Sequence, residues 1–252
     1  MLILLPPSEG KSSPARGLAL DLASLSFPAL TPTREHLIEA LVQLSSDPVR
    51  AARVLGVGPG IAVAAAENAT LLRRPCAPAI TVYSGVLYEA LDFSTLDSRA
   101  RRRARTQVAI ASALWGLLRP ADRIPAYRFS AGVALPGVAA APWRRPIEST
   151  LAEIPGLVVD LRSGAYAAMA RVPDVQRLAS VRVLHEFDGR RTVVSHHNKA
   201  TKGRLARYLL QADTVPRTVD ELIVAVEQAG FTVEASTGPG GAMRIDVVVT
   251  RA

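Results

Sequence analysis

The sequence predicts an α+β fold in which helices pack on a mixed β-sheet. Apolar segments of strand type alternate with segments of helical spacing along the whole chain, which is typical of an interspersed fold. No internal repeat and no long linker divides the 252 residues, so we expect a single domain over 1–252. Hydrophobic residues make up 49% of the chain and charged residues 21%, which excludes a disordered protein.

The first elements are expected to be a strand and two helices. Residues 2–5 are an apolar run that two prolines end, which predicts a buried strand. Residues 33–44 carry apolar side chains at helical spacing. A short helix follows over 47–55, because Asp47 followed by proline is typical of a helix start and a glycine ends the segment.

The middle of the chain predicts three strands and two helices. Residues 79–83, 108–118 and 157–161 are short apolar runs of strand type, the second with a turn. Residues 84–91 predict a capped helix. The arginines within 99–105 predict a solvated helix face, with nucleic-acid contact as the alternative.

Two hairpins are expected in the last third. Residues 181–187 and 191–196 flank Asp188–Gly189, a pair that tolerates the positive φ of a tight hairpin turn. Residues 231–235 and 243–250 alternate like the arms of a terminal hairpin around a glycine-rich turn.

Two helices are expected between these hairpins. Residues 198–210 have helical spacing. A second helix begins at Thr218 with a capping box and ends at Gly230. Strands thus precede and follow helices to the end of the chain, which supports the mixed sheet.

Charge indicates the class of partner. Thirty Lys and Arg residues against 22 Asp and Glu give a net charge of +8, which favours polyanionic partners because neutralised phosphates release counterions. The alternative is a genome that favours arginine. Only three of the thirty are lysines, and Lys11, Lys199 and Lys202 therefore mark places where a compact, titratable amine is expected.

Other features indicate the compartment. The lone Cys76 cannot form an internal disulfide, which predicts a reducing environment. The start lacks a basic region, and no apolar stretch reaches the about 18 residues of a spanning helix. We expect a cytoplasmic protein without membrane attachment. Because His196 and His197 on a strand would point to opposite faces, we expect no metal site, and we expect no cofactor.

The sharpest local pattern is VLGVGPGIA over 54–62, within a segment of about 47–72. This pattern resembles the helix-hairpin-helix element of DNA repair and replication proteins. Gly56, Gly58 and Gly60 would let backbone amides approach a DNA phosphate without reading the base sequence. The alternative is a glycine-rich turn that joins two packed helices.

Cationic side chains follow several expected strand ends or lie in the first turns of helices, where α/β folds build ligand sites. The loop that carries Lys11 resembles only the end of a phosphate-binding loop, because Leu5 stands where the first glycine is required. We expect one basic cleft. Its nucleic-acid contacts, beside the glycine hairpin, are expected to be Lys11, Arg119, Arg128, Lys199, Lys202, Gly203 and Arg207.

Six blocks in order along the chain are similar to the peroxide stress resistance protein YaaA family. The blocks are LILLPPSEGK (2–11), YSGVLY (83–88), LWGLLRPAD (114–122), AYR (126–128), VVDLRSGAY (158–166) and SHHNKATKG (195–203). The resemblance implies a cytoplasmic protein that helps bacteria withstand hydrogen peroxide by limiting unincorporated iron. It also implies a one-domain α/β fold with a positively charged cleft, a helix-hairpin-helix element and binding to duplex or branched DNA.

Two functions of different classes remain open. The first is a DNA-binding protein without catalysis. The second is an enzyme of lyase or glycosylase type that acts on nucleic acid or a nucleotide, in which Lys11 or Lys199 forms an imine. Such an enzyme needs a carboxylate that moves protons near the lysine, and the candidates are Glu9, Asp122 and Asp160.

Overall fold

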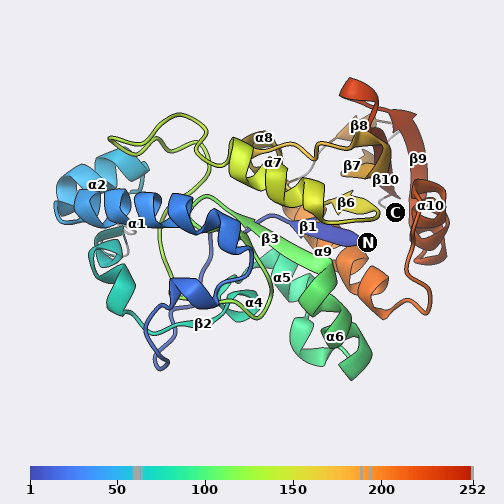
Figure 1. Ribbon diagram of the computed structural model, residues 1–252. Coiled ribbons are helices and arrows are strands. Elements are labelled where there is room, and N and C mark those ends of the chain that lie inside the picture. The colour runs from blue at the N-terminus through green and yellow to red at the C-terminus, as the bar shows by residue number, and fades with distance from the viewer. Residues whose placement is uncertain (59–62, 64, 188–189, 193–194, 251–252) are drawn as a thin grey trace.

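The computed structural model describes residues 1–58, 63, 65–187, 190–192 and 195–250. Helices pack around a mixed sheet of eight strands (Figure 1), which confirms the predicted fold class. The sheet path runs β4-β3-β1-β6-β7-β10-β9, and β8 pairs with β7. Its strands are β1 (Leu2–Leu5), β3 (Val108–Ser112), β4 (Gly116–Leu118), β6 (Val158–Asp160), β7 (Leu178–Phe187), β8 (Arg190–Thr192), β9 (Thr232–Thr237) and β10 (Met243–Thr250). A separate small sheet pairs β2 (Ala77–Pro78) with β5 (Arg123–Ile124).

The centre of the large sheet is parallel. β3, β1, β6, β7 and β10 run in one direction, and β4 and β9 pair antiparallel at the two ends of the path. Every residue of β1 and β3 is buried, which explains why these strands are continuous apolar runs. Because carboxyl ends of parallel strands share one edge of a sheet, the loops after β1, β3 and β6 lie together.

Some helices begin with side-chain caps that the sequence specifies, whereas the helix over Val86–Leu91, which was expected to be capped, has no side-chain cap. The Asp47 side chain accepts hydrogen bonds from the N–H groups of Val49 and Arg50, and the Thr218 side chain accepts from that of Glu221. The helices are α1 (Thr31–Ser45), α2 (Pro48–Leu55), α4 (Ala79–Val82), α5 (Val86–Leu91), α6 (Ser98–Gln107), α7 (Arg144–Glu153), α8 (Gly164–Met169), α9 (Ser195–Gln211) and α10 (Val219–Gln228). Short 3₁₀ helices cover Leu22–Ser24, Pro28–Leu30, Glu67–Arg73, Phe93–Thr95, Val175–Arg177 and Pro239–Gly241.

Both expected hairpins form, and two element predictions need correction. β7 pairs with β8, and β9 with β10, each antiparallel, while the predicted turn at 188–189 lies outside the described residues. The strand predicted over 191–196 ends at Thr192, and helix α9 already begins at Ser195. The strand predicted over 79–83 is wrong, since this segment forms α4. A four-residue apolar run has no periodicity that distinguishes a strand from a helical turn.

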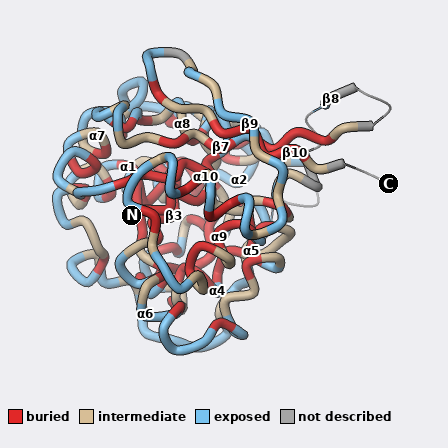
Figure 2. The backbone as a smooth tube through the Cα atoms, turned by 90° about the vertical axis from the view of Figure 1, so that its right-hand side faces the viewer, coloured by how far each residue is buried: buried red, intermediate tan, exposed pale blue. Residues whose placement is uncertain are grey.

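The core lies in the sheet interior and on the helix faces that cover it, as Figure 2 shows in red. Arg34 on α1 is completely buried there. Its guanidinium donates to the carbonyl oxygens of Trp115 (2.9 Å), Leu117 (2.9 Å) and Ser26 (2.8 Å), which ties α1 to the β3–β4 turn. Within the described ranges, no helix is both long and apolar enough to cross a lipid bilayer.

Candidate functional site

A cavity of about 840 Å³ lies at the carboxyl ends of the parallel strands. It is called the strand-end pocket here. Its walls are the loop 6–10 after β1, the start of α5 at 85–88, the loop 161–166 after β6, the middle of β7 at 181–183, and the start of α9. Ligand sites of α/β proteins commonly occupy this position, because the loops at this edge can vary without disturbing the sheet.

Helix α9 brings two of the three lysines to the strand-end pocket. Lys199 is exposed on its rim. The Lys202 Nζ donates to the carbonyl oxygens of Leu161 (3.0 Å) and Arg162 (3.2 Å), so this lysine ties α9 to the end of β6. Burial lowers the pKa of Lys202, and the Asp160 carboxylate opposes that shift. The pocket therefore has a cationic wall of one exposed and one bonded lysine.

A buried ion pair supports the loop after β6. The Asp160 carboxylate accepts from the Arg162 backbone N–H (3.0 Å), its Nε (2.9 Å) and its Nη2 (2.8 Å). Arg162 Nη1 also donates to the carbonyl oxygens of Tyr166 (3.3 Å) and Ala170 (3.0 Å). Since both oxygens of Asp160 hold Arg162, this carboxylate fixes the pocket wall rather than moving protons for Lys11.

Lys11 lies behind the loop that lines the strand-end pocket. Its Nζ donates to the carbonyl oxygen of Ser8 (2.8 Å), and Ser8 itself lines the pocket. The same Nζ is 4.6 Å from the ring centroid of Tyr127 and 5.7 Å from that of Tyr83. Burial lowers the pKa of Lys11 to about 8, Glu9 opposes the shift, and Arg128 adds to it. The amine is thus neutral far more often at neutral pH than an ordinary lysine.

Glu9 is the candidate carboxylate that accompanies Lys11. It lines the pocket, its carbonyl oxygen accepts from Arg128 Nη1 (2.6 Å), and its carboxylate oxygens lie 3.0 and 2.9 Å from Ser130 Oγ. The structure therefore brings Lys11, Glu9 and Arg128 together. Of the three carboxylates that the sequence suggested, Glu9 is the one whose charge acts on Lys11. The two groups form no direct ion pair, so a proton would pass between them through water.

The structure does not bring Arg119 or Asp122 to the strand-end pocket. Arg119 Nη1 donates to the carbonyl oxygens of Thr106 (2.6 Å) and Val108 (2.9 Å), which lie at the opposite, amino end of β3. The Asp122 carboxylate accepts from the backbone N–H of Arg119 (2.8 Å) and from Ser26, whose N–H and Oγ lie 3.1 and 2.7 Å away. Both residues therefore fix the turn that follows β4.

Gly203 and Arg207 position α9 against α5. A Cβ atom at Gly203 would lie 2.2 Å from the Leu87 carbonyl oxygen and 2.8 Å from the Ala90 Cβ, so only glycine permits this approach. Arg207 Nη1 donates to the carbonyl oxygens of Leu91 (3.0 Å) and Asp92 (2.7 Å) at the end of α5. The two residues thus support the pocket wall without facing into the pocket.

The predicted glycine hairpin is described only in part. Gly56 has a φ of 64° and is the C-cap of α2, and its N–H bonds back to that helix. The Val57 N–H likewise donates to the Ala52 carbonyl oxygen (3.0 Å), so neither amide is directed at a ligand. Gly58 is exposed and has open space where a Cβ would lie. Gly60 lies outside the described residues.

Sequence reasoning missed a chain of buried hydroxyl groups beside Lys11. The Tyr127 Oη lies 2.8 Å from the Tyr83 Oη and 2.7 Å from the Ser112 Oγ. The one available signal was position: Ser112 ends a buried strand, and both tyrosines lie in blocks of the family resemblance. Apolar surroundings in the sequence make such hydroxyls look like core residues.

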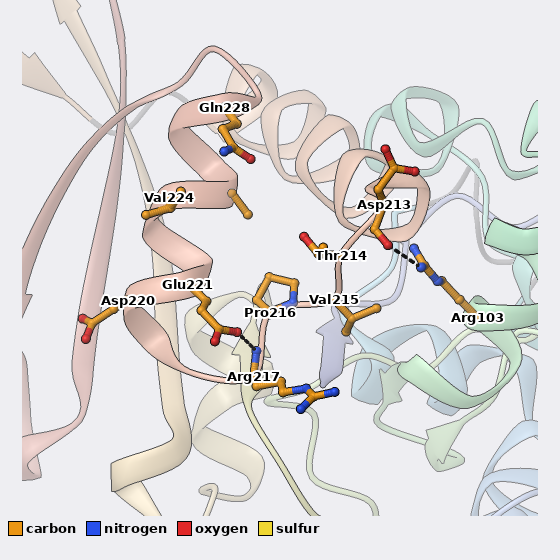
Figure 3. A pocket seen from close by; sticks show the side chains of 11 residues that line it. Arg103, Asp213, Thr214, Val215, Pro216, Arg217, Asp220, Glu221, Val224 and Gln228 are labelled. Carbon is orange, nitrogen blue, oxygen red and sulfur yellow. Dashed lines mark hydrogen bonds between the residues drawn. The ribbon is translucent and has the colours of Figure 1, made fainter.

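A second cavity, of about 830 Å³, lies between α6, the segment 213–217 and α10 (Figure 3). Its polar groups bind their own chain: Arg103 Nη2 donates to the Asp213 carbonyl oxygen (3.2 Å), and the Glu221 carboxylate accepts from the Arg217 N–H (2.7 Å). None of the described residues that the sequence predicted as site residues lines it. The strand-end pocket is therefore the better candidate.

Comparison with known proteins gives one consistent result. A family model described as "Peroxide stress protein YaaA" matches residues 1–237. The UPF0246 protein of Streptomyces coelicolor is 46% identical over 258 residues, covering 99% of this chain and 98% of that protein. The UPF0246 protein of Corynebacterium efficiens is 43% identical over 244 residues, covering 94% and 96%. A UPF0246 protein of Corynebacterium glutamicum is 40% identical over 240 residues, covering 93% and 95%.

Proposed function

The chain belongs to the peroxide stress protein YaaA family, and from this premise we propose that it acts in peroxide stress by binding nucleic acid at the strand-end pocket. The contacts are to phosphates of duplex or branched DNA and carry little sequence preference. The observation that carries the proposal is that two of the chain's three lysines, Lys199 and Lys202, lie on one wall of this pocket in a chain of net charge +8.

The available charges favour an anion at this wall. Lys199 is exposed, so its ammonium group can meet a phosphate without breaking a bond of the fold. Asp160 is already neutralised by Arg162, and the Glu9 carboxylate is held by Ser130. A phosphate that approaches α9 therefore meets an uncompensated cation first.

The physiological part of the proposal is that the protein limits unincorporated iron while it is bound to nucleic acid. It comes from the family resemblance alone. The test compares chelatable iron after peroxide treatment in cells that lack the gene and in cells that carry either the wild-type gene or the Lys199→Gln variant. Equal iron levels in all three would contradict it.

The binding test is a titration of a fluorescent duplex at several salt concentrations. We expect affinity to fall steeply as salt rises, and Lys199→Gln to reduce the slope of log affinity against log salt by about 0.9, the loss of one phosphate contact. The matched control is Arg102→Gln, which removes the same charge from an exposed position on α6 that does not line the pocket.

Two results would overturn DNA binding at the strand-end pocket. The first is an affinity that does not change with salt. The second is an equal effect of Lys199→Gln and Arg102→Gln, because general charge rather than this wall would then explain the binding. A branched duplex titrated beside the linear one measures whether shape is recognised.

A second candidate function is lysine chemistry on nucleic acid or a nucleotide. The observation that favours it is the largely buried Lys11 amine, packed against the Tyr127 ring, with its pKa lowered to about 8 and the charge of the Glu9 carboxylate acting on it. Borohydride trapping on a duplex with an abasic site tests it. We expect a covalent complex with the wild-type protein and none with Lys11→Arg, and absence of a complex in both would exclude this reaction.

A further inference from the structure

The hydroxyl chain beside Lys11 consists of Ser112, Tyr127 and Tyr83, and the direction of its first hydrogen bond is fixed at Ser112. Ser112 Oγ accepts hydrogen bonds from the backbone N–H groups of Leu114 (3.2 Å) and Trp115 (3.0 Å). A hydroxyl oxygen has two lone pairs and one proton, so both acceptor positions of Ser112 are filled. Ser112 must therefore donate its own proton to the Tyr127 Oη, 2.7 Å away.

The three hydroxyl groups of this hydrogen-bonded chain hold one proton more than the bonds between them use. Ser112, Tyr127 and Tyr83 hold three hydroxyl protons, but only two bonds join their oxygens. Tyr127 accepts a hydrogen bond from Ser112 and donates one to Tyr83, so the hydroxyl proton of Tyr83 has no acceptor within this group of three. If Tyr83 were the donor instead, the spare proton would belong to Tyr127. Among the hydrogen bonds of the described residues, neither phenol has a further acceptor.

An unused buried hydroxyl proton destabilises the folded protein unless a ligand accepts it. Both phenols are buried. Burial raises the pKa of Tyr83, and the neighbouring hydroxyl groups of Tyr127 and Ser112 oppose that shift only in part. The phenols consequently keep their protons at neutral pH, so the spare proton is a permanent hydrogen-bond donor.

This donor lies close to the Lys11 amine and to the pocket wall. Lys11 forms a backbone bridge with Tyr83, and the Ser84 N–H donates to the Gly10 carbonyl oxygen (3.1 Å). The lysine Nζ lies against the rings of Tyr83 and Tyr127 and donates to the carbonyl oxygen of Ser8, a residue that lines the cavity. An amine and a spare phenol proton thus lie behind one short loop.

We propose that Lys11 and the Tyr83–Tyr127 pair form a carbonyl site, in which an aldehyde reaching in from the strand-end pocket is attacked by Nζ while its oxygen accepts the spare phenol proton. This inference deepens the second candidate function and rests on it. It does not depend on DNA binding. Ser112 acts through Tyr127 and is a positioning residue.

The reaction balances without an outside reagent. The neutral amine forms a bond to the carbonyl carbon, and the oxygen that receives the π electron pair takes the phenol proton. The nitrogen then gives one proton to Glu9. The hydroxyl group leaves as water with that proton, and the nitrogen returns its last proton to the phenolate. The products are an imine and water, and Glu9 and the phenol are restored.

The lowered pKa of Lys11 suits this role. At about 8, the amine is neutral in a useful fraction of molecules near neutral pH, which attack on a carbonyl requires. Lys199 and Lys202 serve as internal references for the reactivity of Lys11, because the sequence contains these three lysines and no others. A reaction at each of them can be measured separately by peptide mass spectrometry.

The experiment uses the full chain and pyridoxal, an aldehyde without phosphate whose imine absorbs visible light. The imine is followed in time, reduced with borohydride and mapped by mass spectrometry. We expect Lys11 to react ahead of Lys199 and Lys202. The double variant Tyr83→Phe/Tyr127→Phe is expected to slow imine formation at Lys11 by about 100-fold, the lower end for loss of a general acid, and to leave the pH midpoint unchanged.

The matched control is Tyr208→Phe. Tyr208 is a half-buried residue of α9 that does not line the strand-end pocket and takes no part in the hydroxyl chain. We expect this variant to react at the wild-type rate. A variant that merely loosens the fold would instead raise the pH midpoint of Lys11 and speed its labelling.

Two outcomes overturn the carbonyl site. One is equal labelling of the three lysines in the wild-type protein, a measurement that needs no variant to fold. The other is a wild-type rate in a double variant whose melting temperature shows that it is folded. Duplex titration of the same samples separates the proposals: DNA binding without Lys11 selectivity overturns this inference alone, and selectivity without DNA binding overturns the nucleic-acid proposal alone.

Discussion

The Nζ atom of Lys11 lies 4.6 Å from the centroid of the Tyr127 ring. The ring face attracts the ammonium form, while burial favours the neutral amine, and burial dominates because the pKa falls to about 8. The same ring carries the hydroxyl that Ser112 and Tyr83 contact. One aromatic residue thus joins the lysine to the hydroxyl chain.

Replacing Lys11 by methionine is expected to change how stability depends on pH. The lysine has a pKa of about 8 in the folded protein against 10.5 as the ordinary value, so between these pH values the unfolded chain binds more protons. The free energy of unfolding of the wild type therefore rises over this window relative to Lys11→Met. Urea unfolding of both proteins at pH values below 8 and near 10.5 measures the difference. Parallel curves would contradict the lowered pKa.

The two described hairpin glycines are expected to respond differently to valine. Gly56 has a φ of 64°, so Gly56→Val should lose about 1–2 kcal/mol of unfolding free energy through left-handed strain. Gly58 has open space around its Cβ position, so Gly58→Val should fold normally. If the hairpin holds a phosphate, Gly58→Val also weakens duplex binding. Unchanged affinity in that folded variant would remove the hairpin from the binding site.

Gly203→Ala is expected to separate α9 from α5. The added methyl group would lie 2.2 Å from the Leu87 carbonyl oxygen, a clash that only backbone movement can relieve. We expect the free energy of unfolding to fall by about 3 kcal/mol or more, at or above the usual range of about 1–3 kcal/mol for overpacking. Gly58→Ala, in open space, is the control. Urea unfolding measures both variants. A Gly203→Ala protein within about 0.5 kcal/mol of the wild type would show that the helices can move apart cheaply.

Removing Arg162 tests the support of the loop after β6. Arg162→Met leaves the Asp160 carboxylate buried without its cationic partner, so the free energy of unfolding should fall by about 3–5 kcal/mol. The control is Arg99→Met, which breaks the exposed pair with Asp213 and should cost at most about 1 kcal/mol. Chemical denaturation at neutral pH compares the two. Equal losses would mean that water reaches Asp160 in the folded protein.

The sequence by itself determined the elements whose signals are local. Helix α2 begins where Asp47 can reach the N–H groups two and three residues ahead, and the arms of the terminal hairpin alternate in step with the two faces of a strand. Such contacts span a few residues, so a pattern of residue types specifies them. The segment 79–83 shows the limit, because four apolar residues fit a strand or a helical turn equally well.

Only the tertiary structure decided which charged groups reach a common pocket. Arg119 and Lys199 both looked like cations at element ends, yet Arg119 meets carbonyl oxygens at the amino end of β3 while Lys199 lies exposed on the pocket rim. The carbonyl groups that bind Arg119 come from Thr106 and Val108. The Tyr127 hydroxyl bonds both to Ser112 and to Tyr83, which is 29 positions before Ser112 in the sequence. Hydrogen bonds act over about 3 Å in space, so side chains of the same charge acquire different roles according to which distant segments the sheet brings beside them.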